Sequence, residues 1–437
     1  MTAPHLLRPH LLRNARLIDP EAGTDSLGDL LIEDGRIAAV APPGELAFEL
    51  GETTECGGLA LAPGIVDMNV YVGEPGARHR ESYRTVGLAA AAGGVTTLAV
   101  RPDTDPPIDD AAVLGFVAQR AAEACPVNVR IMGALTRGCA GKLMSEMGFL
   151  TDAGAVAFSD GDHAVADPVV MRRCLTYARS MGALVIHHPQ EPAFAARGCA
   201  TESFFATKLG LPGVPAMAER MMLERDLALV ELTGARYHAD QVSTRGALEA
   251  LARARDAGLP VSASASAHHL TLNELDIEPY RTFFKLDPPL RCEEDREALV
   301  AAVAEGLVEV IVSAHLPQDE ELKRLPFEQA APGAVGLETL LPAALQLVHG
   351  GAMDLPALFA RLSLAPARLL GLEAGRLAPG APADLVLFDP GAPFVLDRAG
   401  LRSRSKNTPY DLRRMTGKVR GTWVAGARVF APEEETA

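Results

Sequence analysis

The segment from residue 95 to residue 124, VTTLAVRPDTDPPIDDAAVLGFVAQRAAEA, decides the fold class. It opens with the short apolar run Val95–Val100 and continues with a helical pattern from Asp110 to Ala124. A buried strand followed by an amphipathic helix is the repeating unit of parallel α/β proteins. The segment therefore predicts one strand–helix unit.

The same rhythm returns along the middle of the chain. Further apolar runs occupy residues 64–71, 129–135, 155–158, 184–187, 235–238, 261–265 and 308–313. One helix boundary is explicit, since Asp167 precedes Pro168 as a cap precedes a proline at the first helical position. Together with residues 95–100 these runs give eight candidate strands, which predict an α/β fold with a closed (β/α)8 TIM barrel over residues 61–370.

Both ends of the chain have a different pattern. Near the start, residues 30–32 and 37–40 flank a turn signal and predict a hairpin. Near the end, residues 383–388 and 421–425 are short apolar strands between Gly and Pro. We expect residues 1–60 and 371–437 to form one small β-sandwich domain. The Pro- and charge-rich stretch 316–333 predicts a long loop over the barrel.

Composition excludes several classes of protein. The 437 residues are 48% hydrophobic and 22% charged, and no apolar run reaches the ~18 residues of a membrane helix. Residues 1–5 show no secretory signal, so we expect a cytoplasmic protein. The six cysteines lack paired spacing and predict reduced thiols, Cys199 and Cys292 included. A net charge of −15 disfavours nucleic acid as a partner.

Working side chains of a parallel barrel project from the carboxyl ends of its strands. The first strand ends in Asp67–Tyr71, where Asn69 and Tyr71 lie on one side because side chains alternate along an extended chain. An amide and a phenol are therefore expected at the mouth of the barrel.

This strand end resembles the signature of cyclic amidohydrolases, and the chain as a whole resembles the dihydroorotase family. The resemblance is carried by residues 64–71, 73–76, 92–97, 101–106, 154–160, 209–213, 287–291 and 405–409. It implies an amidohydrolase-type barrel in which a metal-activated water opens a cyclic amide.

The resemblance also implies that the metal ligands have been replaced. Asn69 and Tyr71 stand where the family has two metal-binding histidines, and Gln241 stands where it has a third. Ala314 stands where the family has an aspartate that binds metal and acts as general base, and a methyl group cannot accept a proton.

Other positions are changed or ambiguous. Gly73 and Asp103 correspond to the arginine and asparagine that hold the family's substrate carboxylate, which an acidic side chain would repel. His187 falls on a metal-binding position and Asp160 near the bridging carboxylate. Taken alone, however, such a histidine is more often a hydrogen-bonded core residue, and such an aspartate a turn or cap former.

These replacements predict a non-catalytic dihydroorotase-like protein of pyrimidine biosynthesis with no catalytic residue, no bound metal and no cofactor. The resemblance implies aspartate carbamoyltransferase as its partner in an assembly, and a homodimer or larger oligomer. One alternative is an active cyclic amide hydrolase that uses His187, Asp160, His238 or His315 around one metal. Another is a homo-oligomeric scaffold protein.

Overall fold

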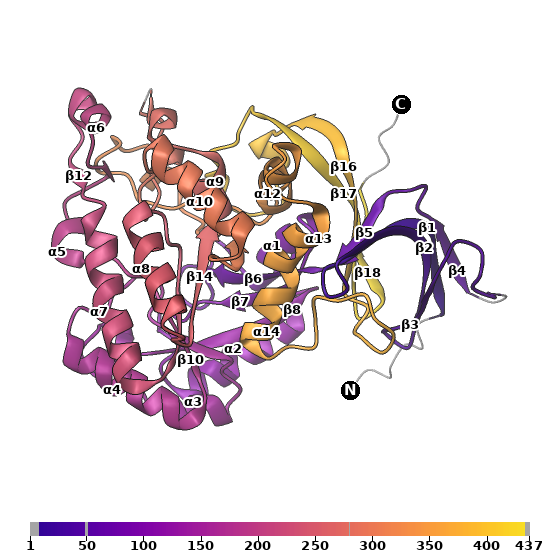
Figure 1. Ribbon diagram of the computed structural model, residues 1–437, viewed down its shortest axis with the longest axis horizontal. Coiled ribbons are helices and arrows are strands. Elements are labelled where there is room, and N and C mark those ends of the chain that lie inside the picture. Colours follow the sequence, from indigo (N-terminus) through magenta and orange to yellow (C-terminus); the bar gives the residue numbers. More distant parts are fainter. Residues whose placement is uncertain (1–7, 49–50, 279, 433–437) are drawn as a thin grey trace.

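The computed structural model describes residues 8–48, 51–278 and 280–432, so the expectation about residues 1–5 lies outside the described residues. Eight parallel strands form one sheet in the order β15-β14-β13-β10-β9-β8-β7-β6 (Figure 1). Their bounds are β6 Ile65–Val70, β7 Val95–Val100, β8 Asn128–Ala134, β9 Ala157–Ser159, β10 Leu184–His187, β13 Arg236–Ala239, β14 Val261–Ser266 and β15 Val310–Val312. The sheet confirms the predicted strands.

Backbone contacts between the first and last strands close the sheet into a barrel. Val70 and His315 form a parallel bridge, and the Tyr71 amide donates to the His315 carbonyl oxygen at 2.9 Å. This contact joins the end of β6 to the segment after β15, so the first and last strands meet. The predicted TIM barrel is confirmed.

Helices cover the outside of the barrel. The main ones are α1 Tyr83–Ala92, α2 Ala111–Ala124, α3 Met147–Asp152, α4 Pro168–Met181, α7 Met217–Thr233, α8 Arg245–Asp256, α10 Glu293–Glu305 and α12 Leu340–His349. Helix α4 begins as predicted, because the Asp167 carboxylate accepts a hydrogen bond from the Val169 amide at 2.7 Å. It ends where Gly182 adopts a left-handed φ of +67°.

Shorter elements lie in the connections and next to the barrel floor. They are α5 Pro192–Ala195, β11 Ala200–Thr201, α6 Phe204–Leu209, β12 Gly213–Val214, α9 Ala267–Thr271, α11 Glu320–Lys323, α13 Leu355–Phe359 and α14 Ala365–Leu370. Helix α11 interrupts the stretch 316–333 that the sequence predicted to be a loop. Apolar side chains from six strands pack inside the barrel against α14, for example Met68, Ile186 and Leu370.

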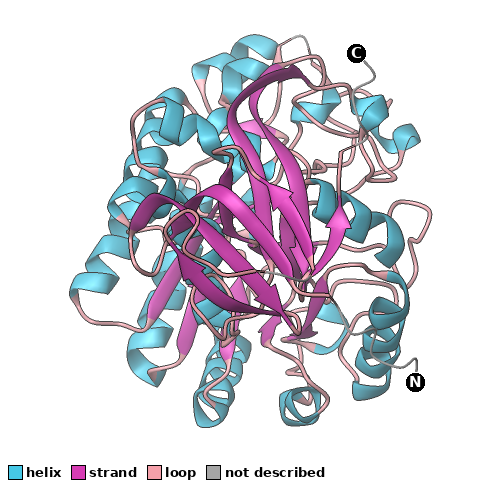
Figure 2. Cartoon of the chain, turned by 90° about the vertical axis from the view of Figure 1, so that its right-hand side faces the viewer, coloured by secondary structure: helices cyan, strands magenta, loops and turns pink. Residues whose placement is uncertain are grey.

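The two ends of the chain build a second sheet, in the order β18-β17-β16-β5-β1-β2-β3 with β4 beside β1. Figure 2 shows the molecule from the side on which this sheet lies. Its strands are β1 His10–Asp19, β2 Thr24–Glu33, β3 Arg36–Ala41, β4 Glu52–Glu55, β5 Ala60–Pro63, β16 Leu385–Val395, β17 Arg414–Val424 and β18 Ala427–Phe430. Strands β5 and β16 pair antiparallel and so join the two ends, while Trp423 packs fully buried with Leu12 and Leu385. The small β domain made from both ends is confirmed.

Among the helices of the described part of the chain, none is long and apolar enough to cross a membrane.

Candidate functional site

Arg101 lines the barrel mouth, directly after β7. Its guanidinium pairs with Asp103, with Nη2 to Oδ2 at 2.5 Å and Nε to Oδ1 at 3.1 Å. It also pairs with Asp162, at 2.7 Å from Nη2 and 2.8 Å from Nη1. Burial alone would lower the pKa of Arg101, but the charges of the two aspartates outweigh it and raise the pKa well above its ordinary value.

Asn69 and Tyr71 face this arginine, as their alternation on β6 predicts. The Asn69 side-chain oxygen accepts from Arg101 Nη1 at 3.4 Å, and the Tyr71 ring centroid lies 5.9 Å from the guanidinium carbon. The Asn69 amide donates to Asp240 Oδ2, and Ser264 donates to Asp240 Oδ1 at 2.7 Å. Burial raises the pKa of Asp240. Two of the replaced positions therefore contribute to one polar network.

His187 is placed at the end of β10 but is fully hydrogen-bonded. The Val165 amide donates to Nε2 at 2.9 Å, which fixes the proton on Nδ1, and Nδ1 donates to Asp226 Oδ2 at 2.7 Å. Tyr237 and Arg225 also donate to Asp226, at 2.8 and 2.6 Å. Neither nitrogen of His187 is left for a metal ion.

Asp160 is likewise held by its neighbours. Its carboxylate accepts from the Thr136 amide at 2.8 Å and from the Thr136 hydroxyl. Burial raises the pKa of Asp160, and these hydrogen bonds oppose the rise. The Asp160 side chain therefore links the end of β9 to Thr136 after β8, which is a long-range contact and not the turn or cap that such a residue more often forms.

Gln241 and Ala314 line the mouth beside Arg101, Asp162 and His268. Both adopt left-handed backbone angles, with φ of +55° at Gln241 and +49° at Ala314. The cavity between these side chains is about 10 Å³, room for about one water molecule. Side chains therefore fill the mouth.

Gly73 lies in a loop that has closed upon itself. A Cβ atom at this position would lie 2.2 Å from the Ala77 carbonyl oxygen. Backbone occupies the space that a side chain would need. The arginine that the family resemblance implies at this position therefore has no room here.

Several buried histidines have ring nitrogens without a hydrogen-bond partner. Both nitrogens of His188 and of His268 are in this state, as is Nε2 of His238, whose Nδ1 bonds Ser262 at 2.8 Å. Burial lowers the pKa of His238 and of His268 to about 3, so both are neutral at pH 7. His315 accepts from the Gly336 amide at 3.2 Å and lies 3.5 Å from Glu81.

The residues present do not fit the metal centre that the resemblance implies. Divalent zinc is held by imidazole, thiolate or carboxylate groups that converge on one point. Over residues 8–48, 51–278 and 280–432, no three such side chains come together in this way. The position of the third family histidine offers the Gln241 amide, and that of the base offers a methyl group.

Sequence reasoning missed three parts of this site. Arg101 stood out only as part of a family motif, although a cation at a strand end two residues before Asp103 was a usable signal. Asp240, after β13, had no such signal. Glu219 of α7 accepts from the Ser243 amide at 2.8 Å and lies 3.3 Å from Arg291, so it joins the segment after Gln241 to the family motif 287–291.

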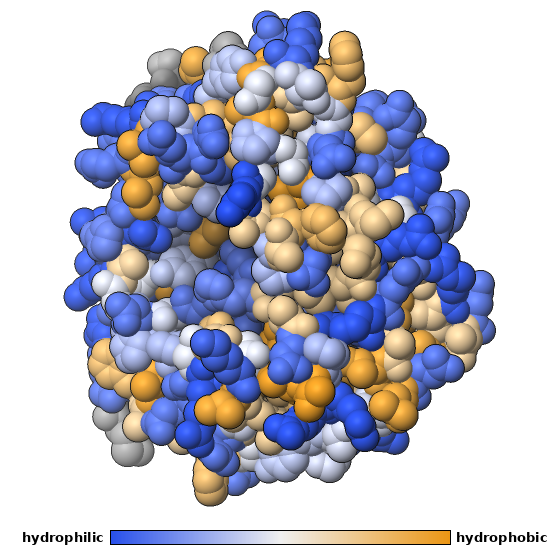
Figure 3. All heavy atoms as spheres, turned by 90° about the vertical axis from the view of Figure 1, so that its left-hand side faces the viewer, coloured by the Kyte–Doolittle hydropathy of each residue, from blue (hydrophilic) through white to orange (hydrophobic). Residues whose placement is uncertain are grey.

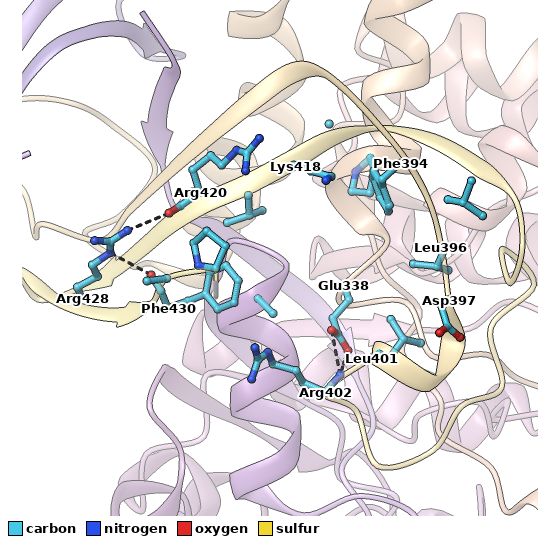
Figure 4. Close-up of a pocket in the computed structure, with 18 residues that line it drawn as sticks. Glu338, Phe394, Leu396, Asp397, Leu401, Arg402, Lys418, Arg420, Arg428 and Phe430 are labelled. Atoms are coloured by element: carbon cyan, nitrogen blue, oxygen red, sulfur yellow. Dashed lines mark hydrogen bonds between the residues drawn. The ribbon is translucent and has the colours of Figure 1, made fainter. Parts of the chain in front are cut away.

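A larger groove lies away from the mouth, against the small sheet (Figure 4). Its volume is about 810 Å³, and its lining includes Arg420, Arg428, Phe394 and Phe430. The Arg428 guanidinium lies over the Trp423 ring, 5.3 Å from its centroid, and donates to two backbone carbonyls of the same sheet. This groove contains none of the sequence-predicted residues.

Comparison with known proteins agrees with the architecture. Residues 58–247 match the Dihydro-orotase-like family profile, and residues 347–430 match an Amidohydrolase family profile. The solved structure of L-hydantoinase (dihydropyrimidinase) from Arthrobacter aurescens superposes with a TM-score of 0.89 at 25% identity, over 98% of this chain and 97% of that one.

Curated relatives match along nearly the whole length. A dihydroorotase from Anaplasma phagocytophilum is 38% identical over 96% of this chain and 95% of its own. A dihydroorotase-like protein from Pseudomonas aeruginosa is 42% identical over 95% of this chain and 98% of its own.

The prediction that the chain is not an enzyme is wrong by this comparison, because several such full-length relatives carry the name of the enzyme. That prediction rested on six replaced positions, whereas the relatives match across both domains. At 38% identity over 96% of its length, this chain belongs to the dihydroorotase family.

Proposed function

We propose that the chain is a hydrolase of the dihydroorotase type that opens a cyclic amide ring in a rebuilt site at the barrel mouth. The observation that carries this proposal is the full-length similarity to proteins named dihydroorotase. The site differs from the one that the resemblance implies, so the reaction depends on this chain's own polar groups. No step of the proposal runs through a metal ion.

The charges at the mouth favour an uncharged ring as substrate. Asp103 and Asp162 together outnumber the single positive charge of Arg101, with which both are paired. A substrate carboxylate at this place would meet net negative charge and is disfavoured. A hydantoin or a dihydropyrimidine, the ring types after which the solved relative is named, lacks that charge.

Substrate binding requires the mouth to widen, since the volume of its cavity is about 10 Å³. The segment 316–333 is the element positioned to move, because Leu316 and Gly333 line the cavity. Asp162, Gln241 and His268 line the same cavity and would face a bound ring. Asp162 is the ionisable carboxylate among these three and therefore the candidate for proton transfer.

The test is ring opening by the purified chain, followed by chromatography with hydantoin, dihydrouracil and dihydroorotate as substrates. We expect turnover of an uncharged ring, its loss in Asp162→Asn, and its retention in Glu249→Gln, an exposed site on α8. Elemental analysis of the same sample accompanies the assay. Absence of turnover with all three rings, in a folded sample, refutes the hydrolase proposal.

We also propose that the chain associates with aspartate carbamoyltransferase in the cytoplasm, as a dihydroorotase-like subunit of a larger assembly. Exposed apolar side chains on α5, α6 and α7 support a protein contact, among them Phe204 at 87% exposure and Met217 at 59%. Figure 3 shows apolar surface among polar residues on the side of the molecule where these helices lie. The test mixes this chain with the carbamoyltransferase of the same organism and measures mass by light scattering. A single heavier species supports the association, and two species of unchanged mass refute it.

A further inference from the structure

The barrel mouth contains a cation that belongs to the chain itself. Arg101 is 4% exposed, and each of its side-chain nitrogens lies within hydrogen-bond distance of an acceptor on Asn69, Asp103 or Asp162. A guanidinium has five N–H donors, and the contacts with these three residues are also five. The hydrogen-bond donors of Arg101 are therefore all matched by acceptors of the protein itself.

The residues that replaced the implied metal ligands suit a guanidinium. Asn69 offers a neutral oxygen that accepts from Nη1, and Tyr71 offers an aromatic face to the positive charge. A histidine at either position would add a further donor or a competing cation beside Arg101. The replacements at residues 69 and 71 are thus both explained by their contacts with the positive charge of Arg101.

We propose that the Arg101 guanidinium is the built-in cation of this site and provides the counter-charge for Asp103 and Asp162, where the family resemblance implies a metal ion. The Asp103 side chain is 9% exposed and the Asp162 side chain 21%. Carboxylates this far from water need a partner charge, because an unpaired buried charge is strongly destabilising. Arg101 lies between the two and pairs with both.

The fold of this chain consequently does not depend on a divalent cation. We expect the wild-type protein to unfold at the same temperature with and without EDTA. Arg101→Met keeps most of the side-chain volume and removes the charge, leaving Asp103 and Asp162 unpaired. We expect its melting temperature to fall by about 3 to 5 °C, as for the breaking of a buried ion pair in a chain of this size.

Companion variants separate charge from packing. The triple variant Arg101→Met, Asp103→Asn, Asp162→Asn removes all three charges and is expected to regain at least half of the lost melting temperature. Arg101→Lys keeps the charge but lacks the planar guanidinium. Its melting temperature is expected to lie between those of wild type and Arg101→Met. Arg172→Met, at an exposed position on α4, is the matched control and should leave the melting temperature unchanged.

The measurement is thermal unfolding by circular dichroism, with metal content from elemental analysis. The inference is overturned where Arg101→Met melts within about 1 °C of wild type, or where the triple variant melts as low as Arg101→Met. It is overturned equally where wild-type protein contains one divalent ion per chain and EDTA lowers its melting temperature. These readouts do not involve turnover, so failure of the hydrolase proposal leaves them intact.

Discussion

Replacing His187 with alanine tests whether this side chain is a metal ligand or a structural hydrogen-bonding group. In the structure its Nδ1–H donates to the buried Asp226 carboxylate at 2.7 Å, and its Nε2 accepts from the Val165 amide at 2.9 Å. The alanine variant loses both hydrogen bonds, and the Asp226 carboxylate and the Val165 amide stay buried without them. We therefore expect a large loss of stability.

The size of the loss follows from the two partners. Removing a hydrogen bond to a charged group costs about 1.5–3 kcal/mol, and leaving a buried amide N–H unpaired costs about 1–3 kcal/mol. Tyr237 and Arg225 still donate to Asp226, which limits the first contribution. We expect the free energy of unfolding of His187→Ala to be about 3–5 kcal/mol below that of wild type.

The assay is urea denaturation of wild type, His187→Ala and His187→Asn, with the exposed His163→Ala as control. The asparagine variant can still donate to Asp226 and should lose about half as much stability. The control should stay within about 0.5 kcal/mol of wild type. If His187→Ala unfolds like wild type but loses a bound metal, His187 is a ligand and its assigned hydrogen bonds are wrong.

Three further predictions concern other positions. Burial lowers the pKa of Lys323 to about 7, so the unfolded chain binds more protons than the native one from pH 7 to pH 10. The free energy of unfolding of wild type relative to Lys323→Met should then rise over that range, by at most about 1.4 kcal/mol per pH unit, and a constant difference between the two denaturation curves contradicts this. Gly73→Ala should lower the free energy of unfolding by about 1–3 kcal/mol, because its Cβ would lie 2.2 Å from the Ala77 carbonyl oxygen. An unchanged midpoint in urea denaturation would show that the loop opens freely. Asn407→Ala should speed amide hydrogen exchange in residues 316–333, since Asn407 donates to the carbonyls at both ends of that segment at 3.1 and 3.0 Å; unchanged exchange would refute this clamp.

The fold was predictable because it depends on patterns that repeat along the chain. Residues 95–100 are buried at every position in β7, and α2 begins one residue after Asp110, as the sequence indicates. Four strands of the small domain, β2, β3, β16 and β17, were found in the same way, whereas β1, β4, β5 and β18 were not predicted. Helix α11 was missed because four residues among prolines and charges give no periodic signal.

The site was only partly predictable, because its contacts join residues far apart in the chain. His187 and Asp226 are 39 residues apart and Asn69 and Asp240 are 171 apart, and neither pairing leaves a mark on local sequence. The sequence identified which positions differ from the family, namely Asn69, Tyr71, Gly73, Asp103, Gln241 and Ala314. It did not show that Arg101 would supply the compensating charge.

The similarity to dihydroorotases and the altered mouth are compatible because they rest on different residues. The segment Val242–Thr244, which follows Gln241, and the family motif Asp287–Arg291 meet at Glu219, which accepts from the Thr244 amide at 3.0 Å and lies 3.3 Å from Arg291. Such contacts hold the barrel loops in register and are needed whatever reaction the mouth performs. Full-length identity therefore supports the family and its class of reaction, whereas the choice of substrate depends on the residues at the mouth. Because those residues include the few charges at the mouth, variants of Arg101 and Asp162 are more informative about function than any further comparison of whole chains.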